Sequence, residues 1–212
     1  MKLQRFIFNP VDVNCYIIWD ESKEAVIIDA AVLFEEEKET LKNFIHNNSL
    51  TIKHHLNTHL HFDHIFGNPF IEQEFGIQSE ANDKDWQWAE TISERVARFG
   101  LRYNEKIPSL GKVLSDGDTI TFGNTTIKAI HVPGHSPGSL AYYIAEENIL
   151  FSGDALFQGS IGRTDFSDAD YNTLINSIKN KLLHLPDDTQ VFPGHGDGTT
   201  IGFEKQYNRF LI

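Results

Sequence analysis

The order in which strand-like and helix-like stretches follow one another is the feature that most constrains the fold of this chain. Short runs rich in β-branched and aromatic residues predict strands over residues 14–19, 25–28, 51–57, 119–122, 125–130, 139–145, 149–151 and 189–192. Apolar residues at helical spacing predict helices over residues 34–48, 68–76 and 170–185, and a longer helix that begins after Asn82 and reaches Phe99. Strands interleaved with widely spaced helices indicate one α/β domain in which helices pack over sheets.

Composition and charge narrow the class of protein further. The 212 residues are 40% hydrophobic, which is enough for the core of one large domain. The formal net charge of −12 disfavours a nucleic-acid partner, because an acidic surface repels phosphates. The apolar run at residues 6–8 is too short for a secretory signal or a spanning helix, and the single cysteine, Cys15, is expected in the core. We therefore expect a cytoplasmic protein with no membrane partner and no intrachain disulfide.

One segment directly after the strand at residues 51–57 carries four possible metal ligands within six positions. They are His59, His61, Asp63 and His64. In an extended stretch His59 and His61 point the same way, so one ion can take both, whereas Asp63 and His64 diverge toward a second ion or a bound water. Imidazole and carboxylate ligands suit zinc, iron, manganese or nickel. The alternative is a solvated polar loop, which the position at a strand end disfavours.

Three further candidates follow later strands in the same way. His135 lies in a Pro- and Gly-bearing turn after the strand at residues 125–130, Asp154 follows the strand at 149–151, and His195 follows the strand at 189–192. Loops at the carboxyl ends of strands are where sites assemble in α/β proteins. Each of these residues alone is a weak signal, and the coincidence of four such places predicts one metal centre.

Taken together, these residues resemble the metallo-β-lactamase superfamily. The motif H-x-H-x-D-H is present as His59, His61, Asp63 and His64, and the later His, Asp and His follow in the expected order. Within the superfamily the chain is similar to the hydroxyacylglutathione hydrolases (glyoxalase II), especially the short bacterial form. The strings that carry this likeness are residues 152–157, 159–165, 192–196 and 199–202.

The resemblance implies a four-layer αββα sandwich in which residues 1–212 form one hydrolase domain, without the C-terminal helical domain that binds glutathione in full-length glyoxalase II. It also implies two divalent metal ions per chain, with zinc expected first and iron or manganese also compatible. The implied ligands of the first ion are His59, His61 and His135. Those of the second are Asp63, His64 and His195, and Asp154 would bridge the two ions.

A centre of this kind needs no amino-acid nucleophile. Two metal ions lower the pKa of a bridging water, polarise a substrate carbonyl and stabilise the oxyanion. Asp63 can orient the resulting hydroxide and later accept its proton. A thiolate, with an ordinary pKa of about 8.5, leaves without protonation, so a small-molecule thioester is a natural substrate. The resemblance implies a glutathione thioester such as S-lactoylglutathione.

A few residues outside the metal motif have two interpretations each. Arg163 matches a basic substrate-binding position of the family, but it can equally form a structural salt bridge, and Asp165 stands where the family has a tyrosine. We interpret Trp86 and Trp88 as packing residues, with a substrate-lining role as the alternative. His131 either supports a metal ligand through its ring or is a structural histidine.

Other functions are compatible with parts of the same sequence. Residues 134–138 match the G-x-S-x-G motif of serine hydrolases, but Pro137 lacks the N–H that the oxyanion hole requires, and a strand rather than a helix follows. A persulfide dioxygenase of the same superfamily would bind one iron through His59, His135 and Asp154 and would consume oxygen. A lactone or ester hydrolase and a non-catalytic metal-binding protein are the remaining alternatives.

Overall fold

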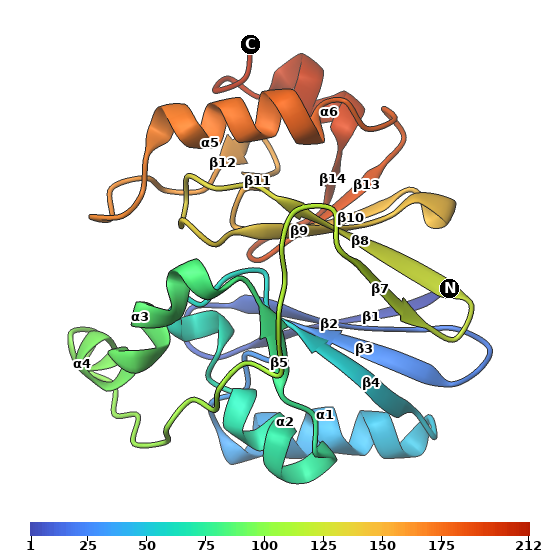
Figure 1. Ribbon diagram of the computed structural model, residues 1–212, viewed down its shortest axis with the longest axis vertical. Coiled ribbons are helices and arrows are strands. Elements are labelled where there is room, and N and C mark those ends of the chain that lie inside the picture. Colours follow the sequence, from blue (N-terminus) through green and yellow to red (C-terminus); the bar gives the residue numbers. More distant parts are fainter.

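The computed structural model describes residues 1–212 as two six-stranded sheets packed face to face (Figure 1). The first sheet contains, in spatial order, β1 (Lys2–Phe8), β2 (Val13–Trp19), β3 (Glu24–Ile28), β4 (Thr51–Leu56), β5 (Ser79–Ala81) and β6 (Lys112–Val113). Strands β1 to β3 pair antiparallel, and β3 to β6 pair parallel. Its outer face is covered by α1 (Glu35–Asn47) and α2 (Asn68–Phe75).

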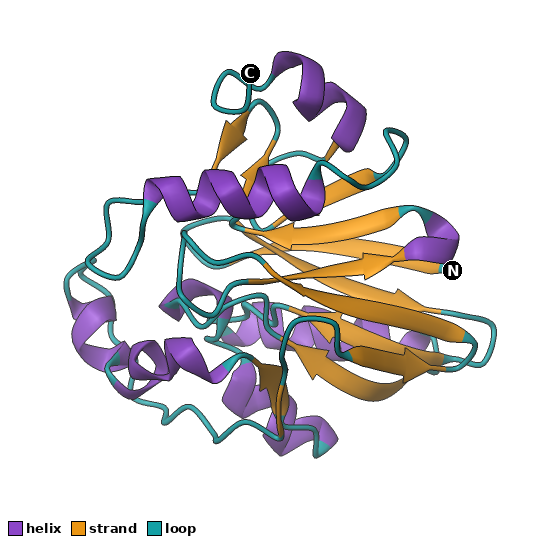
Figure 2. Cartoon of the chain, turned by 45° about the horizontal axis from the view of Figure 1, so that its top comes forward, coloured by secondary structure: helices purple, strands orange, loops and turns teal.

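The second sheet contains, in spatial order, β14 (Thr199–Thr200), β13 (Gln190–Pro193), β10 (Ile149–Gly153), β9 (Leu140–Ile144), β8 (Thr125–His131) and β7 (Thr119–Phe122). Only β10 and β13 pair parallel. A short hairpin of β11 (Leu156–Phe157) and β12 (Ser160–Ile161) follows β10. The outer face is covered by α5 (Tyr171–Ser177), the π-helical turn Ile178–Leu182 that continues it, and α6 (Ile201–Tyr207). Figure 2 shows helices flanking both sheets, which makes four layers.

The core is divided among the spaces between these layers. Strand β2 is buried along its whole length, because alternate side chains face opposite sides of a sheet that is covered on both. Ile17 packs with Leu41 under α1, whereas its neighbour Ile18 packs with Tyr142 between the two sheets. A third cluster, which includes Leu174, lies between the second sheet and its helices. The expected αββα sandwich is therefore confirmed, and Cys15 is buried in the core as expected.

The expected long helix after Asn82 is wrong, because the chain breaks it into three pieces. Asn82 caps only the 3₁₀ turn Asp83–Asp85, through its side chain and the Lys84 N–H. Helices α3 (Trp86–Glu90) and α4 (Ile92–Ala97) follow, separated at Thr91, whose backbone leaves the helical region and whose hydroxyl donates to the Gln87 carbonyl. Phe99 lies beyond α4 and is 60% exposed. Figure 1 shows α3 and α4 beyond one end of the two sheets.

Smaller differences concern strand and helix ends. Strand β1 is absent from the predicted strands, because its polar residues interrupt the run of apolar residues that marks a strand. Pairing with β2 holds it at the edge of the sheet. Asn68 lies inside α2 instead of capping it, and its side-chain amide donates to Asn57 Oδ1 and Ser79 Oγ. Gly76 ends α2 in a left-handed conformation, as expected. No helix of the chain is both long enough and apolar enough to cross a membrane.

Candidate metal centre

The seven side chains expected to bind metal converge at one edge of the sandwich. His59 and His61 follow β4, and the 3₁₀ turn Phe62–His64 places Asp63 and His64 beside them. His135, Asp154 and His195 follow β8, β10 and β13. Their ligand atoms form three overlapping groups in which every atom lies within 4.8 Å of the others. The expectation that these residues lie close together at strand ends therefore agrees with the geometry.

The first group consists of His59, His61 and His135, all of which are at most 4% exposed. His135 Nδ1 donates to the Arg163 carbonyl at 2.8 Å, which leaves Nε2 with a free lone pair. This Nε2 lies 2.9 Å from His61 Nδ1. Burial, together with the neighbouring imidazoles, holds the pKa of His59 and of His61 well below the ordinary value, so both rings are neutral. Neutral imidazole is the form that binds a metal ion.

The second group consists of Asp63, His64 and His195. His64 Nδ1 donates to Asp29 Oδ2 at 3.0 Å, and His195 Nδ1 donates to the Val11 carbonyl at 3.0 Å. Each ring therefore turns its Nε2 toward the centre, and His195 Nε2 lies 3.4 Å from Asp63 Oδ2. Burial lowers the pKa of His64, but the nearby carboxylates outweigh this and hold it well above its usual range.

Asp154 lies between the two groups. Its Oδ1 is 3.6 Å from His64 Nε2, and its Oδ2 is 3.5 Å from His135 Nε2 and 3.6 Å from His195 Nε2. Burial alone would raise the pKa of this carboxyl, but the surrounding histidines hold it well below its usual range. Gly194 makes the close packing possible, because a Cβ there would collide with Asp154 Oδ1 and would approach His64 Cε1 to 2.8 Å. One carboxylate thus faces both groups.

Whether these residues fit metal ions can be judged from the hydrogen-bond partners of their ligand atoms. Three buried atoms at the centre have no hydrogen-bond partner in the protein: His59 Nε2, His64 Nε2 and Asp154 Oδ1. An unpartnered buried polar group costs about 1–3 kcal/mol, so three at one place point to a common partner. Imidazole nitrogens with a carboxylate are the donor set of zinc, iron or manganese. The residues present therefore fit divalent cations in both groups.

Two buried aspartates outside the expected ligand set support the ligands. Asp29, at the end of β3, accepts from the Thr58 N–H and hydroxyl, both at 2.7 Å, as well as from His64. Its backbone is left-handed, with φ of 52°. Asp85 accepts from Ser136 Oγ and the Gly138 N–H at 2.7 Å, and so holds the loop that carries His135. In the sequence Asp29 is marked only by its position at the end of an apolar strand, and Asp85 carries no such mark.

A cavity of about 770 Å³ lies over the centre. Trp88 forms part of its wall, with its ring centroid 4.0 Å from that of His61, and its indole N–H donates to Asp168 at 2.7 Å. Trp88 therefore both packs and lines the cavity. Arg163 also lines it, and its guanidinium forms two 2.7 Å bonds with Asp165. His131 does not contact the ligands; its Nε2 hydrogen-bonds to the Pro137 carbonyl at 2.8 Å.

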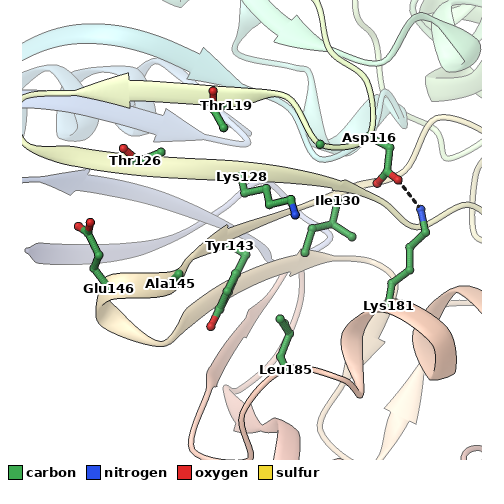
Figure 3. A pocket seen from close by; sticks show the side chains of 11 residues that line it. Asp116, Thr119, Thr126, Lys128, Ile130, Tyr143, Ala145, Glu146, Lys181 and Leu185 are labelled. Carbon is green, nitrogen blue, oxygen red and sulfur yellow. Dashed lines mark hydrogen bonds and ion pairs between the residues drawn. The ribbon is translucent and has the colours of Figure 1, made fainter.

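A second depression of about 730 Å³ lies on the outer face of the second sheet, remote from the metal centre (Figure 3). Strands β7, β8 and β9 and the end of the π-helical turn line it, and Lys181 forms a 3.0 Å ion pair with Asp116 there. None of the groups able to hold a metal ion includes a residue of this depression. Only the first cavity combines space with metal-binding side chains.

The fold and the site together define a protein of the metal-dependent hydrolase class. The family model of the metallo-β-lactamase superfamily matches residues 8–195, and the chain belongs to that superfamily. The resemblance inferred from the motif is thereby confirmed.

Known proteins resemble the chain over nearly its whole length. The hydroxyacylglutathione hydrolase GloC of Haemophilus influenzae is 40% identical over 205 residues, which cover 93% of this chain and 92% of that protein. Among solved structures, the B3 metallo-β-lactamase BLEG-1 has a TM-score of 0.89 and 37% identity, with 99% of both chains covered. TTHA1623, solved in a di-iron-bound form, has a TM-score of 0.87 and 34% identity, with 98% of this chain and 100% of that one covered.

Proposed function

We propose that this chain is a metal-dependent thioesterase that hydrolyses hydroxyacyl thioesters of glutathione, with S-lactoylglutathione as its representative substrate. The observation that carries the proposal is the convergence of His59, His64 and Asp154, whose buried ligand atoms have no hydrogen-bond partner, beside a cavity that Asp154 lines. The likeness to GloC over 93% of the chain supports the choice of a glutathione thioester.

In this proposal the chain binds two divalent cations, with zinc as the first candidate. His59, His61 and His135 would hold one ion, and Asp63, His64 and His195 would hold the other, with Asp154 facing both groups. Bound ions of this kind supply an activated water at neutral pH and polarise a carbonyl oxygen.

The chain's own residues orient and hold the reacting groups. Burial raises the pKa of Asp63, but His64 and His195 outweigh this and lower it, so the carboxylate stays ionised and can accept a hydrogen bond from the attacking water. The aromatic rings of Trp88 and Phe166 wall the cavity and exclude bulk water from the acyl group. The departing thiolate needs no proton donor, because its ordinary pKa is about 8.5.

The experiment is hydrolysis of S-lactoylglutathione by purified, metal-loaded protein, followed as loss of thioester absorbance. The matched variant is His59→Ala, and His184→Ala, which lies outside the metal centre, serves as the control for loss of a histidine. The proposal predicts turnover in the wild type and in His184→Ala, and none in His59→Ala. Oxygen uptake with glutathione persulfide in place of thioester hydrolysis, or metal binding with no turnover of any acyl substrate, would contradict it.

A further inference from the structure

Arginines gather at the metal cavity although the chain as a whole is strongly acidic. Three arginines line the cavity, Arg95 and Arg98 from the α4 segment and Arg163 from the loop after β12. Arg163 is neutralised by its bidentate pair with Asp165. Neither Arg95 nor Arg98 forms a salt bridge, in a protein with thirty acidic and eighteen basic residues. Two arginines without an acidic partner thus remain beside the cavity.

Arg95 is held in a defined position by two contacts. Its guanidinium carbon lies 3.4 Å above the ring of Trp88, and its Nε donates to Thr91 Oγ1 at 2.8 Å. The Asp168 carboxylate accepts from the Trp88 indole and forms no ion pair with Arg95. These contacts use only one of the five N–H donors of the guanidinium, and the terminal nitrogens keep theirs.

The helix that carries Arg95 is anchored and reaches close to the metal centre. Ile92 and Val96 are at most 3% exposed and fix α4 in the cluster beneath it. Trp88, over which the Arg95 guanidinium lies, also contacts the metal centre, because its ring centroid is 4.0 Å from that of His61. One indole ring therefore separates the Arg95 guanidinium from a residue of the first metal group. Arg98 follows three positions later, so it lies on the same side of the helix.

A planar guanidinium with free terminal nitrogens is suited to bind a carboxylate through two parallel hydrogen bonds. A small acyl group fills only a small part of a 770 Å³ cavity, so the remaining space must hold the thiol half of a thioester. We propose that Arg95, with Arg98 beside it, forms a subsite for a carboxylate of the thiol half, and that the chain selects acyl thiols whose thiol carries such a group. This inference rests on the proposed thioesterase function.

The test compares two thioesters with the same acyl group in Arg95→Gln and in the wild type. S-lactoylglutathione carries carboxylates on its thiol half, whereas S-lactoyl-N-acetylcysteamine carries no charge. For Arg95→Gln we expect kcat/KM to fall about 10- to 100-fold with the first substrate, mainly through KM, and by less than about twofold with the second. Arg102→Gln, which removes the same charge outside the cavity, should match the wild type with both. Arg95→Lys should recover only part of the lost kcat/KM, because an ammonium group keeps the charge but cannot form the two parallel hydrogen bonds of a guanidinium.

The results that overturn the subsite differ from those that overturn the thioesterase. Equal losses with both thioesters, or no loss with either, would show that Arg95 does not recognise a carboxylate. Wild-type protein that hydrolyses neither thioester would contradict the proposed function, and binding of S-methylglutathione, measured calorimetrically, would then decide the subsite. Binding weakened about tenfold or more by Arg95→Gln but not by Arg102→Gln supports it. Binding that is absent, or insensitive to Arg95, refutes it.

Discussion

The two halves of the metal centre are built from the same edge of the same sandwich, yet they offer a metal ion different surroundings. The first group is made only of imidazoles, and each residue is at most 4% exposed. The second group includes a carboxylate, and the side chain of His195 is 27% exposed. The ring pKa values of His59 and His61 are lowered by burial, whereas carboxylates raise that of His64. The first group is therefore the more enclosed of the two, although residues of both groups line the cavity.

The largest effect is expected from removing the carboxylate that the halves share. Asp154→Asn replaces a charged oxygen that lies 3.5–3.6 Å from histidines of both groups with a neutral amide. We expect metal content to fall in both halves and turnover to fall by more than the roughly 100-fold that loss of a supporting hydrogen bond can cost. Metal analysis and S-lactoylglutathione hydrolysis measure this. Asp197→Asn, at an 82% exposed side chain, is the control, and equal behaviour of the two variants would refute the bridging role.

A smaller effect that separates the halves is expected from Asp63→Ala. This side chain belongs only to the second group, and in the proposed function it orients the water. We expect turnover to fall about 100-fold, while the first group keeps its ion and total metal content falls by no more than about half. Turnover that survives intact would make Asp63 a bystander. Loss of both ions would show that the halves do not bind independently.

The smallest effect is expected at a buried histidine that belongs to neither metal group, so that burial alone determines its effect on stability. His55 on β4 is fully buried, neither of its ring nitrogens has a partner, and burial lowers its pKa to about 3. In the unfolded chain its pKa is about 6.5, so the unfolded state takes up the proton first as pH falls. Below about pH 6.5 the free energy of unfolding therefore drops, by at most about 1.4 kcal/mol per pH unit from this residue.

His55→Leu removes this proton uptake and the unpartnered nitrogens. We expect the variant to be more stable than the wild type, with a difference that grows as pH falls from about 6.5 toward about 4. Denaturant unfolding of both metal-free proteins over that range measures it. A difference that does not change with pH would mean that burial does not keep this imidazole neutral. Burial would then also fail to explain neutral rings at His59 and His61.

The sequence predicts most of the site because its pattern is local. His59, His61, Asp63 and His64 stand together in one motif, and each later candidate follows a recognisable strand, so strand order alone brings them to one edge. Asp29 supports His64 across 35 positions of sequence, and no local pattern marks such a contact.

The part of the fold that the sequence predicts least well is the α3–α4 segment. Its apolar spacing is continuous through Val96, but Thr91 leaves the helical backbone, and a single residue of this kind has no signature in periodicity. The same break decides where Arg95 and Trp88 lie relative to the cavity. The cavity wall therefore depends on a local backbone choice, whereas the metal centre depends on the order of strands, which is easier to predict.

The central claim is that two dissimilar metal groups act together, and reconstitution of metal-free protein with zinc tests it most directly. Zinc is added in steps, and S-lactoylglutathione turnover is measured against equivalents bound. We expect the first equivalent to give little turnover and full activity to require the second. Full activity at one equivalent would contradict a centre that needs both halves.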